Sequence, residues 1–187
     1  MTTILETERL ILRTWRASDL EPMCKINQDP KVMAYFPGLQ DRATTKQFID
    51  KVTAHYQKNN YALYATQLKS THEFIGFIGL DRVNFSAHFT PAIEIGWRLS
   101  SKHWNKGYAT EGAKAVLHYA FTTLDIPEII SFTVTGNTPS RRVMEKIGLS
   151  HNVSDDFAHP KLGDDSPLQQ HVLYRLTKAV YLSRNQK

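Results

Sequence analysis

The segment from residue 92 to residue 121 constrains the fold most, because its hydrophobic period changes partway along. Residues 92–99 alternate apolar and polar side chains, which is typical of a β-strand. Residues 100–108 form a loop of small and basic residues that contains Gly107. After the loop, apolar residues recur at the spacing of an amphipathic helix, and the set comprises Ala113, Val116, Leu117, Ala120, Phe121 and Leu124. The sequence therefore predicts a strand, a glycine-containing loop and a helix in succession.

This succession favours an anion-binding site at the beginning of the helix. The first N–H groups of a helix have no partner within it, and the helix dipole places partial positive charge there. Lys102, His103 and Lys106 strengthen the attraction for an anion. We therefore expect this loop to bind a phosphate group.

Length and composition indicate one globular domain. The 187 residues fit a single domain, and no repeat or linker-like segment divides them. We expect a core at residues 8–178 and a frayed polar tail at residues 179–187. Lys and Arg exceed Asp and Glu by 23 − 18 = 5, which is either a mild bias toward polyanions or simply a basic surface. Without a run of basic residues, we do not expect a nucleic-acid partner.

The sequence also carries expectations about location. No stretch approaches the roughly 18 apolar residues that a membrane span needs, so we expect no membrane association. The N-terminus lacks the apolar segment of a secretion signal. Cys24 is the only cysteine, which excludes an intrachain disulfide and favours a reducing compartment, the cytoplasm.

The remaining pattern predicts a mixed α/β fold with about seven strands and about four helices. Further strands are expected at residues 9–15, 61–68, 74–83 and 128–135, from Leu149, and at 171–177. Further helices are expected after Ser18 or Asp19, at 44–59, and after a cap at Thr138. Gly76 and Gly79 indicate a bulge or a close backbone approach. The aromatic-rich loop at residues 31–42 is either a functional loop or a hydrophobic plug.

The connection between strands 92–99 and 128–135 is long enough for the two strands to run parallel. Ligands of such sheets bind beyond the carboxyl ends of the strands. The first strand ends at Leu99 and Ser100, and the second ends at Gly136 and Asn137. We expect an elongated ligand with a diphosphate at one end to lie there, paired in part with strand backbone.

Three stretches together resemble the GNAT superfamily of acyl-coenzyme A N-acyltransferases. They are TERLILRTW near the N-terminus, WNKGYATE at residues 104–111, and NTPSRRVMEKIGL at residues 137–149. The chain looks closest to the branch that contains the ribosomal-protein N-terminal acetyltransferases. It departs from the superfamily at Trp104, where Gln or Arg is usual, and from the branch at Asn105, where Gly is usual. Asn tolerates left-handed backbone conformations, so the loop can still form.

The resemblance implies acetyl-coenzyme A as co-substrate, with its diphosphate on backbone N–H groups from about Asn105 to Thr110. The implied cofactor-binding residues are Leu99, Ser100, Trp104, Asn105, Lys106, Gly107, Tyr108, Ala109, Thr110, Asn137, Ser140 and Arg141. Asn137 would bond the pantetheine arm and Ser140 would lie near the sulfur, although both residues also suit plain helix capping.

The implied reaction is direct attack of an amine on the thioester in a ternary complex. Glu94 is the candidate base, or alternatively the partner of a neighbouring Arg. A backbone N–H near Leu99 would stabilise the oxyanion. Ser140 and Tyr174 are candidates for the acid that protonates the thiolate.

The acceptor would be an amine, either a protein N-terminus or a small molecule, placed between loops 31–42 and 155–169. We expect a monomer or a homodimer. A non-catalytic coenzyme A-binding sensor is the alternative function. We expect no metal, because the spacing of His151, Asp155, Asp156 and His159 fits no zinc pattern.

Overall fold

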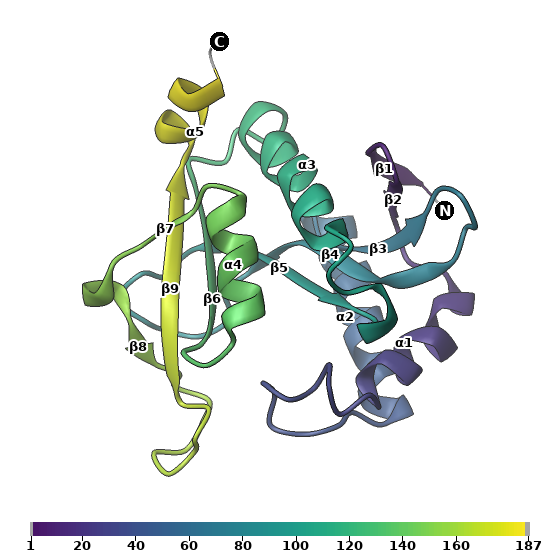
Figure 1. Ribbon diagram of the computed structural model, residues 1–187, viewed down its shortest axis with the longest axis horizontal. Helices are drawn as coiled ribbons and strands as arrows, with labels where there is room; N and C mark the ends of the chain where they lie inside the picture. The colour runs from purple at the N-terminus through teal and green to yellow at the C-terminus, as the bar shows by residue number, and fades with distance from the viewer. Residues whose placement is uncertain (1, 186–187) are drawn as a thin grey trace. The chain divides into compact units, whose positions relative to one another are not determined.

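The computed structural model describes residues 2–185, in which there are nine strands and five α-helices (Figure 1). The strands are β1 (Thr3–Glu6), β2 (Leu10–Arg13), β3 (Leu63–Leu68), β4 (Phe74–Arg82), β5 (Ile93–Leu99), β6 (Glu128–Val134), β7 (Ser150–His151), β8 (Phe157–Ala158) and β9 (Gln170–Thr177). The α-helices are α1 (Leu20–Asn27), α2 (Arg42–Asn59), α3 (Tyr108–Thr122), α4 (Thr138–Lys146) and α5 (Lys178–Asn185). The predicted mixed α/β class is confirmed. Both element counts exceed the expected ones. β1 and β8 are too short for a hydrophobic period to reveal them, and the additional helix is α5.

The chain divides into two compact units. The first contains residues 2–81 and 96–116, and the second contains residues 82–95 and 117–185. β5 and α3 therefore each contribute residues to both units.

In the first unit, β1 to β4 form consecutive antiparallel pairs. A hairpin turn joins β3 to β4, and Leu68 N–H donates to the Glu73 carbonyl over 2.9 Å. α1 and α2 supply three of the six buried residues of an apolar core, whose members are Met23, Ile26, Val32, Met33, Ile49 and Phe77. α2 begins two residues before the predicted start, because Asp41 caps it by accepting from Thr44 N–H over 2.7 Å.

Gly76 and Gly79 mark two close backbone approaches, as predicted. A Cβ atom at Gly76 would lie 2.1 Å from the carbonyl oxygen of Arg98, and one at Gly79 would lie 2.1 Å from that of Ala62. Gly76 also has a φ of 132°, and the β3–β4 register shifts next to it, between Thr66 and Gln67. No other residue fits these positions without a shift of the backbone.

A buried ion pair fixes the start of α1. Both terminal nitrogens of Arg13 bond the carboxylate of Asp19 over 2.7 Å, and Arg13 Nε donates to Gln67 Oε1 over 2.8 Å. The two charged side chains are 2% and 3% exposed. Removing either partner would leave an uncompensated buried charge, so this pair specifies how β2 leads into α1.

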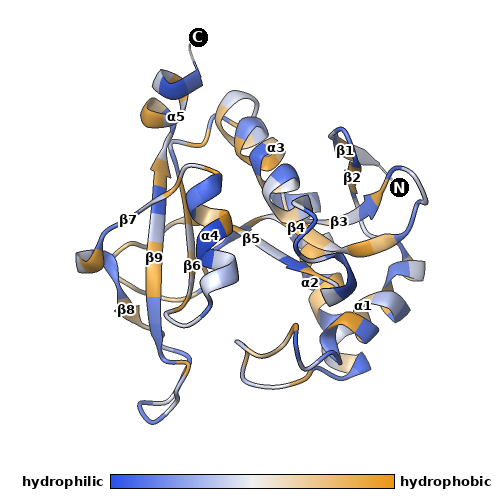
Figure 2. Cartoon of the chain, viewed as in Figure 1, coloured by the Kyte–Doolittle hydropathy of each residue, from blue (hydrophilic) through white to orange (hydrophobic). Residues whose placement is uncertain are grey.

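In the second unit, β5 and β6 run parallel, with Glu94 opposite Ile130, as the long connection predicted. β6 pairs antiparallel with β9 along its whole length, and β7 and β8 both pair with β9. Figure 2 shows hydrophobic residues interspersed with hydrophilic ones along β9. α4 is capped by Asn137 and not by Thr138, because the Asn137 side chain accepts from Ser140 N–H.

The C-terminal residues correct one prediction. Residues 179–185 belong to α5 and are not frayed, whereas residues 186–187 lie outside the described residues. Tyr181 packs against Phe121 with ring centroids 4.9 Å apart, and the side chain of Arg184 donates to the Gly148 carbonyl over 2.8 Å. These contacts join residues far apart in the sequence, so the polar composition of the tail did not reveal them.

An aromatic cluster in the second unit predicts a pH-dependent stability. His159 and His171 have ring centroids 5.0 Å apart and lie against Phe157 and Phe132. Burial lowers the pKa of both imidazoles, and for His159 the charges of His171 and Lys161 add to the effect.

The unfolded chain therefore binds more protons than the native protein once the pH falls below about 6.5, so the free energy of unfolding should decrease with acidification. For the buried His171 the slope is at most about 1.4 kcal/mol per pH unit. Urea denaturation between pH 8 and pH 5 measures it. The double variant His159→Phe, His171→Phe should flatten the dependence, whereas the exposed control His72→Asn should keep it.

Candidate active site

The loop between β5 and α3 has the left-handed turn that the sequence suggested. Asn105 has a φ of 60° and Gly107 a φ of 81°. Trp104 closes the turn by donating from Nε1 to the Leu99 carbonyl over 2.9 Å, with its ring 40% exposed. The substitution of Asn for Gly at position 105 is therefore tolerated, because Asn adopts the left-handed conformation more readily than most residues.

The backbone N–H groups of residues 105–110 point to no acceptor among the described residues. The first helical hydrogen bond of α3 runs from Glu111 N–H to the Gly107 carbonyl over 3.0 Å. The N–H groups from Asn105 to Thr110 therefore remain available where the positive end of the helix dipole adds to their field. This arrangement fits a diphosphate, since successive free N–H groups at a helix start are a common anion site.

Four contacts fasten the loop to the rest of the first unit. Ser100 N–H donates to the Ile75 carbonyl over 2.9 Å, and Ser101 Oγ donates to Asp29 Oδ2 over 2.5 Å. His103 Nε2 lies 3.1 Å from Glu73 Oε1, and Arg9 Nη1 donates to the Lys106 carbonyl over 3.0 Å. The hydrogen bond from Ser101 is the main reason why the pKa of Asp29 is lowered. Ser100 keeps its hydroxyl for a ligand, because its N–H is bonded and its carbonyl already accepts from His103 N–H over 2.9 Å.

Glu111 joins the first turn of α3 to the connection between β1 and β2. Its carboxylate accepts from Thr7 Oγ1 over 2.5 Å, from Arg9 N–H over 2.8 Å and from Arg9 Nε over 2.6 Å. Burial by itself would raise the pKa of Glu111, but the hydrogen bonds from Thr7 and Arg9 outweigh it and the pKa is lowered. The carboxylate therefore stays ionised and holds Arg9, whose guanidinium also lies 4.6 Å from the Tyr108 ring centre.

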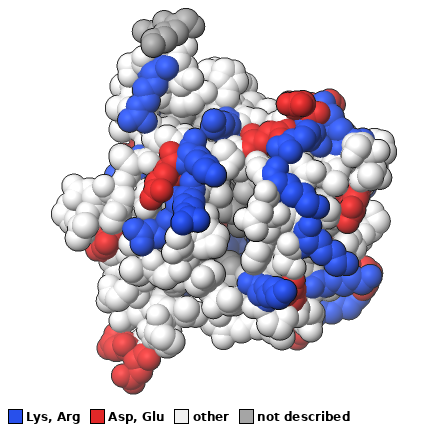
Figure 3. Space-filling view, in the orientation of Figure 1, with Lys and Arg blue, Asp and Glu red and all other residues white. Residues whose placement is uncertain are grey.

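A cavity of about 470 Å³ adjoins the start of α3 in the same unit. It is lined by Glu8, Arg9, Leu68, Lys69, Ser70 and Tyr108. Figure 3 shows Lys and Arg side chains gathered on the face in view, in keeping with the net charge of +5. Both cations of the lining are paired, Arg9 with Glu111 and Lys69 with Glu6, and Glu8 adds a negative charge, so the cavity suits a further polar group of a ligand held by the loop.

The candidates in the second unit are held largely by local hydrogen bonds. Asn137 accepts from Ser140 N–H over 3.3 Å, and its Nδ2 donates to Thr133 Oγ1 over 2.9 Å. The Ser140 hydroxyl bonds no other described residue and is partly buried. Asn137 is thus occupied as a helix cap, while Ser140 keeps a free hydroxyl.

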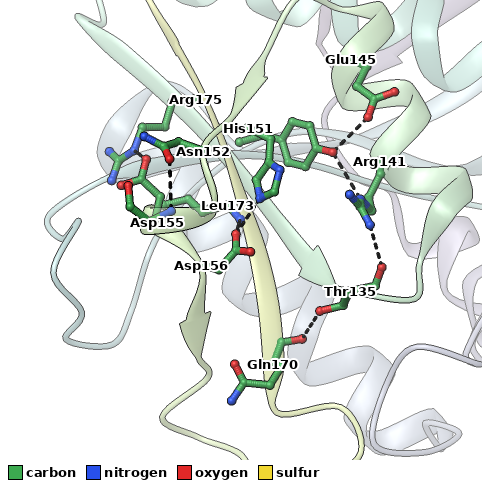
Figure 4. Close-up of polar contacts among 12 residues, drawn as sticks. Thr135, Arg141, Glu145, His151, Asn152, Asp155, Asp156, Gln170, Leu173 and Arg175 are labelled. Carbon is green, nitrogen blue, oxygen red and sulfur yellow. Dashed lines mark hydrogen bonds and ion pairs between the residues drawn. The ribbon is translucent and has the colours of Figure 1, made fainter.

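Tyr174 is almost completely buried, with 1% exposure, and its hydroxyl is bonded on two sides. It donates to Glu145 Oε1 over 3.0 Å and accepts from Arg141 Nε over 3.3 Å (Figure 4). Arg141 Nη1 also donates to the Thr135 carbonyl over 3.1 Å, and its bond to Tyr174 is the main reason why the Arg141 pKa is raised. In this geometry the phenolic proton points to Glu145, so Tyr174 would have to turn before it protonated a ligand.

The residues considered for a metal make ordinary polar contacts. His151 Nε2 lies 2.7 Å from Asp156 Oδ1, and Asp155 accepts from Arg175 Nε over 2.8 Å (Figure 4). Within residues 2–185, no group of three or more His, Cys, Asp and Glu side chains is placed to hold a metal ion. No helix in this range is long and apolar enough to cross a membrane.

Comparison with known proteins decides the family. Residues 9–150 match the family model described as an acetyltransferase (GNAT) domain. The chain belongs to the GNAT acetyltransferase family. In this family acetyl-coenzyme A is the acetyl donor and an amine is the acceptor, so the protein is an N-acetyltransferase.

Individual relatives agree with the GNAT assignment. The chain is 32% identical over 146 residues to the uncharacterized N-acetyltransferase YnaD of Bacillus subtilis (strain 168), covering 78% of this chain and 81% of that protein. It is 31% identical over 151 residues to YkkB of the same organism, covering 80% and 87%. A crystal structure of a GNAT-family acetyltransferase from Bacillus anthracis is 29% identical, with a TM-score of 0.77 over 94% of this chain and 98% of that one.

Several residues of this GNAT site escaped sequence reasoning. Arg9, Glu73 and Asp29 all contact the loop or its flanks, yet each lies far from it in the sequence. Glu111 was identified only as the last residue of the motif at residues 104–111, without its contacts. A charged residue in a strand or turn carries no local signal of its distant partner, so these roles needed the tertiary structure.

The geometry of the GNAT loop predicts the effect of Gly107→Val. A β-branched side chain at a φ of 81° is strained, and its Cβ would lie 3.4 Å from Arg9 Nη2. The turn should distort, and calorimetry should show coenzyme A binding weakened more than about 10-fold, the effect of losing a charge-assisted hydrogen bond. Gly163→Val is the control, because its surroundings are open. Unchanged affinity in Gly107→Val would place the diphosphate elsewhere.

Proposed function

We propose that this enzyme transfers acetyl from acetyl-coenzyme A to a primary amine by direct attack in a ternary complex. The acceptor would be a peptide or protein N-terminal amine or a small amine. The observation that carries the proposal is the row of free N–H groups from Asn105 to Thr110, which begins in a left-handed turn at the start of α3. A row of this kind suits the diphosphate of a coenzyme A thioester.

Each group of residues would have a distinct task. The loop with Trp104, Lys106, Tyr108 and Ala109 would hold the diphosphate, and the cavity beside Arg9 would take a further polar part of the cofactor. Leu99 and Ser100 would pair with the pantetheine arm through their remaining polar groups. In the second unit, Asn137 and Arg141 would contribute cofactor contacts, the former through the N–H and the lone pair that its two present hydrogen bonds leave over.

Acetyl-coenzyme A supplies an activated acetyl group on a thioester. Glu94, partly buried on β5, would take a proton from the incoming ammonium group directly or through a water molecule. A backbone N–H near Leu99 would donate to the carbonyl oxygen as negative charge develops on it. Of the two proposed acids, Ser140 has a free hydroxyl, whereas Tyr174 would first have to release Glu145.

Two relatives support the donor but leave the acceptor open. A segment of 83 residues is 42% identical to an enzyme of Aspergillus fumigatus (strain ATCC MYA-4609 / CBS 101355 / FGSC A1100 / Af293) named FsC-acetyl coenzyme A-N(2)-transacetylase, covering 35% of that protein. The structure of Mycobacterium smegmatis RimJ with CoA-disulfide shares the fold at 18% identity and a TM-score of 0.75. We further propose that residues 1–187 form one N-acetyltransferase domain that acts in the cytoplasm, where Cys24 would stay reduced.

The variant Glu94→Gln tests both the reaction and the base. Thiol release from acetyl-coenzyme A, measured with a panel of amines, should give turnover in the wild type. Glu94→Gln should lower kcat by about 10²- to 10⁴-fold, the usual contribution of a general base, and should remove the limb of the pH profile that rises with pH. Glu128→Gln is the control, since that carboxylate is paired with Arg175. A pH profile that survives in Glu94→Gln would exclude Glu94 as the base, and absence of turnover with every amine would refute the proposed reaction.

A further inference from the structure

Arg98, near the end of β5, is a cation without an anionic partner. Its Nη1 donates to Asn27 Oδ1 over 2.8 Å and lies 3.3 Å from Gln40 Oε1. Both partners are neutral amides. Among the described residues, no carboxylate lies within 4.0 Å of the guanidinium, so nothing on the chain neutralises its charge.

One edge of this guanidinium also lacks hydrogen bonds. The Nε atom of Arg98 is buried and bonds no described residue. Nη2 donates to none of them either, but it is not among the atoms that are sealed from solvent. The edge formed by Nε and Nη2 is one of the two on which a carboxylate can bond a guanidinium, and Nη2 is the atom of this edge that a ligand can reach.

Aromatic rings contact the guanidinium, but neither ring carries a negative charge, and burial disfavours the charged form. The ring of Phe36 lies 4.1 Å from the guanidinium carbon and that of Phe77 lies 5.6 Å away. Burial alone lowers the pKa of Arg98 to about 10. Arg13 gives the contrast, since that buried guanidinium has the Asp19 carboxylate on both terminal nitrogens. Arg13, which has a structural role, thus has a carboxylate partner within the fold, whereas Arg98 has none.

The position of Arg98 connects it with the acceptor and not with the diphosphate. Its side chain meets Phe36 and Gln40 of the loop at residues 31–42, the loop expected to contact the acceptor. Phe36 and Leu39 of this loop are exposed apolar residues, at 37% and 53%.

We propose that Arg98 binds a carboxylate of the acceptor, so that the substrate is an amine that also bears a carboxylate, such as an amino acid or a short acidic peptide. This inference rests on the proposed function and narrows its acceptor. Charge-assisted hydrogen bonds from the free edge would hold the carboxylate, and Phe36 would cover it. A polyamine lacks an anion and carries several positive charges, so an uncompensated guanidinium would repel it.

The first experiment compares acceptors that differ only in the carboxylate. Acetyl transfer by the wild-type enzyme is measured with each of a panel of amino acids and acidic dipeptides, with the corresponding amides, and with spermidine. We expect kcat/KM to favour the carboxylate of the best pair by about 10- to 100-fold, the size of a charge-assisted hydrogen bond. Amino acids and acidic dipeptides form separate arms, which distinguish a small acceptor from a peptide.

The second experiment changes Arg98 in the same enzyme. Arg98→Gln should raise KM for the carboxylated acceptor by about 10- to 100-fold and leave its amide and acetyl-coenzyme A unaffected. Arg98→Lys should restore part of the preference, because it keeps the charge and loses the fork. Lys46→Gln is the control, since it removes an exposed cation paired with Asp50 on α2.

The outcomes separate this inference from the proposed function. Three outcomes would overturn the role of Arg98 without affecting the proposed acetylation. They are equal kcat/KM for acids and amides, a higher kcat/KM for spermidine, and an Arg98→Gln variant that still prefers acids to amides. Absence of turnover with every amine would refute the proposed function. In that case, calorimetry with N-acetylated amino acids and their amides decides the role of Arg98 independently, since only the acids should bind the wild type and neither should bind Arg98→Gln. If Arg98→Gln fails to fold, Arg98→Lys and the acid–amide comparison on the wild type still decide.

Discussion

The carboxylate of Glu111 is the contact on which the anion-binding loop depends. It lies in the first turn of α3 and accepts hydrogen bonds from Thr7 and Arg9, which are more than one hundred residues away in the chain. Arg9 in turn donates a hydrogen bond to the Lys106 carbonyl, so a residue outside the loop stabilises the turn that contains Gly107. Because carbonyls of the loop are bonded to the protein, its N–H groups are left facing outward. A site made of backbone donors needs this support, since the donors themselves contribute nothing to the stability of the turn.

Two arginines show how the first unit uses buried charge. Arg13 is the more buried, and Asp19 and Gln67 satisfy it almost completely, so it fixes the path from β2 to α1. Arg98 receives only amide oxygens and aromatic rings. A buried cation without a counterion costs stability, and such groups persist in proteins chiefly where a ligand supplies the missing charge. The same comparison separates Asn137, whose Oδ1 caps α4 and whose Nδ2 bonds Thr133, from Ser140, whose hydroxyl bonds no other described residue.

Much of the fold could be predicted because its signals are local. The change of period between residues 92 and 121 gave β5, the loop and α3, and the apolar face of α3 is buried at each of the first five positions named. Gly76 and Gly79, which mark the two close backbone approaches, could also be recognised from the sequence as glycines within a strand. The short strands β1 and β8 were missed because two to four residues show no period, and α5 was missed because its polar composition concealed the packing of Tyr181.

By itself, the amino-acid sequence determined the order of strands and helices, the left-handed turn at Asn105 and Gly107, and membership in the acetyltransferase family. These features follow from secondary-structure propensity, hydrophobic spacing and sequence motifs, all of which depend on residues that are neighbours in the sequence. Only the tertiary structure decided which N–H groups stay free, which carboxylate holds Arg9, and that Arg98 has no counterion. Those facts concern pairs of atoms brought together from distant parts of the chain. The residues adjacent in the sequence do not indicate whether such a partner is present.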